Sequence, residues 1–242
     1  MWNKLVHSPA IFLYLFLGTA ISIAIGFWSH NQYLMPLLNV LVPYPVMYKL
    51  LAEEKRKRAF ATMLFWALCT GVLTTWAVVH FYDQATAAIF HGAAYKQEMF
   101  HWIRTGEGAE GNPARFVPQH LIHFVIFCVL SAVSAGFLSL LMGAFLMNYM
   151  SYYVGSLIAN SSDPFLASMM GWHPWSAVRV ASFVLLGVMI AEPTICKIVK
   201  RDYNYSEIRP YFWAAITGIA LDVVMKALLA PWWGLTLRKI LQ

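Results

Sequence analysis

Long apolar runs alternate with short polar segments along the whole chain of 242 residues. A helix needs about 20 apolar residues to cross a hydrocarbon core about 30 Å thick. Runs of this length predict seven membrane-spanning helices, at 10–28, 33–51, 59–81, 117–135, 137–158, 176–196 and 210–230. We therefore expect an all-α fold, a polytopic helical membrane bundle in which residues 1–242 form a single transmembrane domain.

Two of the apolar regions must be interrupted. The second run contains Pro43 and Pro45, and proline removes backbone hydrogen bonds from a helix, so a kink is expected there. The region 116–162 carries no charged residue and is too long for one crossing, since a straight helix of that length would measure about 70 Å. A hairpin with its turn at 131–139, around Gly136, divides it into two spans.

The longest polar segment lies between the third and fourth spans, at 82–116. Its first part, 82–102, is expected to form an interfacial helix. The part at 104–115 contains several glycines, two acids and two bases, which is typical of a loop. This loop is either a mobile lid over a site on the outer face or a solvated connector, and we favour the connector.

The charge distribution predicts the orientation. With the N-terminus inside, ten Lys and Arg residues fall on the inner side of the seven-span topology and five on the outer side. Cytoplasmic loops carry such an excess of basic residues. A six-span topology would place the basic segment 197–209 outside and give a poorer division. We expect a multi-pass protein of a bacterial or archaeal cytoplasmic membrane, with its N-terminus inside.

Composition supports a lipid environment. The chain is 60% hydrophobic and 12% charged, with a net charge of +6, whereas soluble proteins carry about 25% charged residues. The basic residues occupy short loops and form no stretch that could follow a nucleic-acid backbone, so no nucleic-acid partner is expected. The expected partners are the lipid bilayer, a small solute or ion, and either further copies of the chain or other subunits of a membrane complex.

Histidines gather on one side of this topology. Seven of the eight fall outside, and His120 and His123 are three residues apart, so they share one helix face. With His80 at similar depth on another span, they could bind a metal ion or a haem. The spacing alone favours the alternative, in which these histidines are interfacial or hydrogen-bonded and hold no ligand. The sequence identifies no cofactor.

Charged residues inside spans are candidates for function because they are costly there. Asp222 and Lys226 are four residues apart in the last span and can pair on one face, which should point into the protein. This pair would either stabilise helix packing or form part of a path for a solute or proton. Arg179 and Glu192 lie nearer the ends of their span and are expected to extend toward the interface as anchors.

A polar stripe follows the fifth span, where Asn148, Tyr152 and Ser156 recur at intervals of four. Such a stripe either joins helices by hydrogen bonds or lines a polar cavity, and we favour the first interpretation. Three functions remain open: a small transporter with Asp222, Lys226 and this stripe on its path, a membrane enzyme or redox subunit using the outer histidines, and a non-catalytic subunit of a larger assembly.

Overall fold

The computed structural model describes residues 2–242, and this part of the chain forms twelve helices. They are α1 (Trp2–His7), α2 (Ala10–Ser29), α3 (Leu34–Leu41), α4 (Tyr44–Ala52), α5 (Arg56–His80), α6 (Tyr82–Ala88), α7 (Gly92–Thr105), α8 (Pro113–Val133), α9 (Phe137–Ala159), α10 (Pro164–Gly171), α11 (Pro174–Val199) and α12 (Tyr205–Ile240). Among the described residues, seven segments are long and apolar enough to cross a membrane: α2, α3 with α4, α5, α8, α9, α11 and α12. The predicted all-α, seven-span fold is confirmed.

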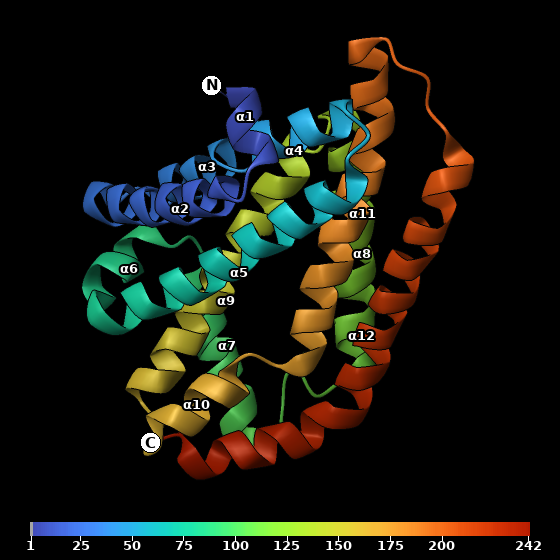
Figure 1. The fold of residues 1–242 in the computed structure, drawn as a ribbon. Coiled ribbons are helices and arrows are strands. Elements are labelled where there is room, and N and C mark those ends of the chain that lie inside the picture. Colours follow the sequence, from blue (N-terminus) through green and yellow to red (C-terminus); the bar gives the residue numbers. More distant parts are fainter. Residues whose placement is uncertain (1) are drawn as a thin grey trace.

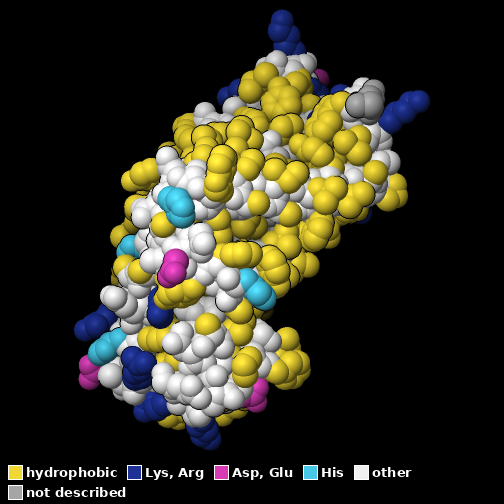
Figure 2. Space-filling view, turned by 90° about the vertical axis from the view of Figure 1, so that its left-hand side faces the viewer, with side chains coloured by type: hydrophobic (Ala, Val, Ile, Leu, Met, Phe, Trp, Pro, Cys, Tyr) yellow, Lys and Arg dark blue, Asp and Glu magenta, His cyan; other side chains and the backbone are white. Residues whose placement is uncertain are grey.

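The bundle has two polar ends. Figure 2 shows a broad apolar band, with most of the visible charged side chains beyond it at the two ends. One end, here called the N-terminal end, carries the N-terminus and the α4–α5 and α11–α12 connections (Figure 1). The other, the C-terminal end, carries α7, α10 and the C-terminus. An odd number of crossings separates the two termini in this way.

Both predicted interruptions are confirmed. The second span breaks between Leu41 and Tyr44, next to Pro43. The hairpin turns between α8 and α9 at Gly136, whose φ of +89° is accessible to glycine at little cost. A Cβ atom on Gly136 would lie 2.9 Å from the Cβ of Ala191, so α11 packs directly against this turn.

The last helix is longer than the sequence indicates. We expected the span to end at 230 before a short tail, but α12 runs for 36 residues, or about 54 Å. Its final turns follow Pro231 and run across the C-terminal end of the bundle (Figure 1). Arg238 Nε donates to the Ile103 carbonyl at 2.8 Å, and Ser162 N donates to the Ile240 carbonyl at 2.8 Å. These contacts hold the end of α12 against α7 and the segment after α9.

The expected interfacial helix is two helices, α6 and α7. α7 packs against α9 and α12, and its Trp102 is buried with Tyr153 of α9 and Trp175 of α11. The segment 82–105 is therefore part of the packed structure at the C-terminal end and helps to build the site described next.

Candidate functional site

A cavity of about 200 Å³ lies among α5, α8, α9, α11 and α12. Because one water needs about 10–15 Å³ of such space, the cavity has room for about a dozen waters or a small organic molecule. Its polar lining lies toward the C-terminal end and comprises His91, Tyr95, Glu98, Glu110, Gln119, His120, His123, Tyr149, Arg179, Asp222 and Lys226. Toward the N-terminal end the lining is mainly apolar, from α4, α5, α9 and α11.

An arginine–aspartate pair joins α11 to α12 at the polar part of the cavity. Arg179 Nε and Nη2 donate to the two carboxylate oxygens of Asp222, at 2.8 and 2.9 Å. Gly218, one turn before Asp222 on α12, allows α11 and α12 to lie this close together. A Cβ atom at that position would collide with Ser182 of α11. Asp222 is only 1% exposed, while Arg179 keeps some exposed surface and lines the cavity. The guanidinium can therefore contact a bound molecule.

A second pair fixes the loop that precedes α8. Lys226 Nζ lies 2.9 Å from Glu110 Oε1 and 4.5 Å from the centre of the Phe116 ring. Burial raises the pKa of the Glu110 carboxyl, but attraction from Lys226, His173 and Arg179 outweighs burial, and the net shift is downward. Glu110 is therefore ionised at neutral pH. Its Oε2 atom is buried and has no hydrogen-bond partner among the described residues.

These two pairs correct the sequence interpretation. Asp222 and Lys226 are buried, as predicted, but the predicted pairing between them is wrong, because each pairs with a residue of another segment. The anchor role expected for Arg179 is also wrong, since its side chain holds Asp222. The favoured solvated connector is wrong for Glu110, which lies against α12.

The three histidines considered as metal ligands do not converge. His120 and His123 line the cavity, and His120 Nδ1 lies 3.8 Å from Asp222 Oδ2. His80 is exposed at the end of α5, where its ring stacks on Trp76 with the ring centres 4.6 Å apart. Within residues 2–242, no three His, Cys, Asp or Glu side chains are placed to hold a metal ion. The expected site shared by His80, His120 and His123 is thus not formed.

The polar stripe on α9 faces other helices. Asn148 accepts a hydrogen bond from Asn39 of α3 at 3.3 Å, and the Tyr152 hydroxyl lies 2.7 Å from that of Thr86 on α6. Ser156 is buried on the same stripe. These contacts match the favoured helix-joining interpretation, and the cavity is lined by other residues of α9.

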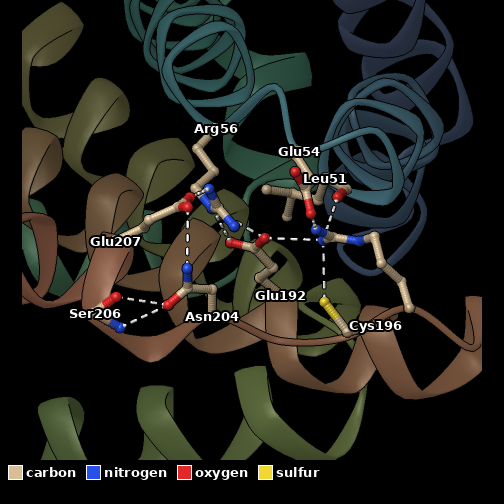
Figure 3. Close-up of polar contacts among 9 residues, drawn as sticks. Leu51, Glu54, Arg56, Glu192, Cys196, Asn204, Ser206 and Glu207 are labelled. Atoms are coloured by element: carbon tan, nitrogen blue, oxygen red, sulfur yellow. Dashed lines mark hydrogen bonds and ion pairs between the residues drawn. The ribbon is translucent and has the colours of Figure 1, made fainter.

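A separate charged cluster ties the N-terminal end together (Figure 3). Glu192 of α11 is 0% exposed and accepts hydrogen bonds from Arg56 Nε at 2.8 and 3.0 Å and from Arg201 Nη2 at 2.9 Å. Arg56 also pairs with Glu207 of α12, and Arg201 with Glu54, before α5. The interfacial anchor role expected for Glu192 is wrong. The cluster connects the start of α5 to α11 and α12.

No family model, curated protein or solved structure matches this chain. The fold and the site themselves define the class, a multi-pass helical membrane protein with a charged cavity between its spans.

Proposed function

We propose that this protein carries a small solute across the membrane and that the cavity among α5, α8, α9, α11 and α12 is its binding site. The observation that supports the proposal is the position of the four paired charges, Arg179, Asp222, Lys226 and Glu110, on the wall of one cavity. Charges within spans are costly and typically line solute or ion pathways. Apolar residues could pack these helices equally well, so stability alone does not account for two such pairs.

The two ends of the bundle suggest how access would alternate. In this proposal the N-terminal end faces the cytoplasm, in keeping with the excess of basic residues there. The cluster around Glu192 closes that end by joining α5 to α11 and α12. Release to the cytoplasm requires Arg56 and Arg201 to leave Glu192, a rigid-body rearrangement of packed helices of the kind that carriers use.

Flux in proteoliposomes tests the proposal. Vesicles with the wild-type protein should take up at least one member of a radiolabelled panel of an amino acid, a sugar, a carboxylate, an amine and hexylphosphocholine. Asp222→Asn should abolish this uptake, whereas Asp163→Asn, a change at an exposed carboxylate outside the cavity lining and outside the Glu192 cluster, should preserve it. Uptake no faster than in protein-free vesicles for the whole panel contradicts the proposal.

A redox or metal-dependent enzyme is the second candidate. It is favoured by His120 and His123, which both line the cavity, and by His120 Nδ1, which lies 3.8 Å from Asp222 Oδ2. An absorption spectrum and metal analysis of the purified protein separate the two functions. A Soret band or stoichiometric metal would favour the enzyme, and uptake without either favours the carrier.

A further inference from the structure

We propose that the molecule bound in the cavity is an amphiphile with a zwitterionic head group and one short apolar chain. The head group would lie at the polar part, beside Arg179 and Glu110, and the chain would extend toward α4 and α5. This inference rests on the proposed binding role of the cavity, and it names the class of molecule that the cavity takes.

The polar part offers both signs of charge to a bound molecule. Arg179 and Lys226 supply two cations and Asp222 and Glu110 two anions, and all four residues line the cavity. Arg179 uses only Nε and Nη2 on Asp222, which leaves Nη1 for an anionic group. Glu110 and Glu98 both line the cavity, and Glu110 Oε2 is buried without a partner among the described residues, so two carboxylates attract an ammonium group through their negative charge. A head group with separated charges satisfies both sets.

The apolar part offers space for a flexible chain. Four methionines, an adaptable side-chain type, contribute to it with Trp66 and Phe127; they are Met47, Met63, Met147 and Met150. Gly143 of α9 lines this part, and a Cβ atom there would meet no atom within 4 Å. An entirely polar solute would leave the apolar part filled only with water.

Thermal stabilisation of the protein in nanodiscs by short amphiphiles tests this assignment. Hexylphosphocholine, hexyl phosphate and hexyltrimethylammonium share one chain and differ in head-group charge. A molecule that binds only the folded state raises its melting temperature, and at equal concentration the molecule with the lower Kd raises it more. The zwitterion should bind the wild-type protein more tightly than either singly charged amphiphile, and glycerophosphocholine, which lacks the chain, should bind more weakly than hexylphosphocholine.

Two variants separate the parts of the cavity. Gly143→Leu should fill the apolar part of the cavity, and should therefore weaken the binding of hexylphosphocholine while leaving the affinity for glycerophosphocholine unchanged. The control is Leu138→Phe, a substitution on α9 outside the cavity lining. Glu110→Gln should weaken binding of hexylphosphocholine by about tenfold, because its quaternary ammonium group makes no hydrogen bond and is attracted to the carboxylate by charge alone. Gly143→Leu keeps the test decisive where Glu110→Gln fails to fold.

Failure of this inference differs from failure of the carrier function. Three results overturn the amphiphile assignment. They are binding of a singly charged amphiphile as tight as that of hexylphosphocholine or tighter, no binding of hexylphosphocholine, and an unchanged affinity of Gly143→Leu for hexylphosphocholine. Uptake of a polar solute would leave the carrier function standing in each of these cases. Tight binding of hexylphosphocholine without uptake of any panel member would instead retain the assignment and overturn the carrier function.

Discussion

Arg179 on α11 holds the Asp222 carboxylate on α12 by two hydrogen bonds, at 2.8 and 2.9 Å, on the wall of the cavity. One turn further along α12, Lys226 pairs with Glu110 of the loop before α8. The two charges of α12 therefore bind two different segments of the chain. Each charge is neutralised by its partner, which is the condition under which buried ions are tolerated.

Replacing Asp222 by Asn should destabilise the protein, because Arg179 would lose its carboxylate. We expect a loss of about 3 kcal/mol, the lower end for breaking a buried pair, since Arg179 keeps access to the cavity. Unfolding by sodium dodecyl sulfate in mixed micelles measures it. The double variant Arg179→Met with Asp222→Leu should recover most of the stability but not the uptake. If Asp222→Asn is as stable as the wild-type protein, the Arg179–Asp222 pair does not stabilise the fold.

Replacing Glu192 by Gln should weaken the N-terminal end of the bundle. Arg56 and Arg201 would both lose a buried carboxylate, at an expected cost of about 3 kcal/mol. Glu207→Gln is the matched control, because Glu207 is 57% exposed and binds the same Arg56. That variant should lose less than about 1 kcal/mol. Equal effects of the two substitutions in the same unfolding assay would contradict a special role for Glu192.

The spans were predictable because they depend on local properties. Apolar length identifies a crossing, Pro43 interrupts the second span, and Gly136 permits the hairpin turn, whichever helices lie nearby. The length of α12 was not predictable in the same way. Pro231 and the basic residues after it indicate an end, but hydrogen bonds from distant segments, such as Arg238 to the Ile103 carbonyl, hold the helix beyond the proline.

The candidate site was predictable only in part, for a physical reason. The cost of charge in a span identified Asp222 and Lys226 and required them to be buried. Their partners depend on the packing of segments far apart in sequence, as with Arg179, which is 43 residues from Asp222. Glu110 lies among glycines in a polar segment, and no local pattern indicates that it enters the bundle.

The orientation in the membrane follows from charge and remains a prediction. In a variant without the three native cysteines, single cysteines at Lys57 and Asp202 should react with a membrane-impermeant maleimide only from the cytoplasmic side. A cysteine at Glu107 should react only from outside. All three positions are exposed, so access depends on sidedness and not on burial. If the cysteines introduced at Glu107 and Asp202 are labelled from the same side, the topology with seven crossings is excluded.

Acidification should destabilise the C-terminal end of the bundle through His173. Burial lowers the pKa of this histidine to about 4, with Glu110 opposing the shift and Lys226 and Arg179 adding to it. In the unfolded chain its pKa is about 6.5, so between these values the unfolded state binds the additional proton and stability falls as the pH falls. Between about pH 7.5 and 5, His173 should contribute about 2 kcal/mol to the loss of stability.

Melting curves of the detergent-solubilised protein across this range measure the effect. His173→Gln removes one titrating group and should reduce the loss of stability on acidification by about 2 kcal/mol, because Gln stays neutral at every pH. His101→Gln, at an exposed histidine of α7, should keep the wild-type slope. If His173→Gln loses stability on acidification as steeply as the wild type, the proton is taken up elsewhere. A shallower profile in that variant, and not in His101→Gln, assigns this part of the acid sensitivity to His173, whose ring stacks on Trp175 with the ring centres 4.6 Å apart.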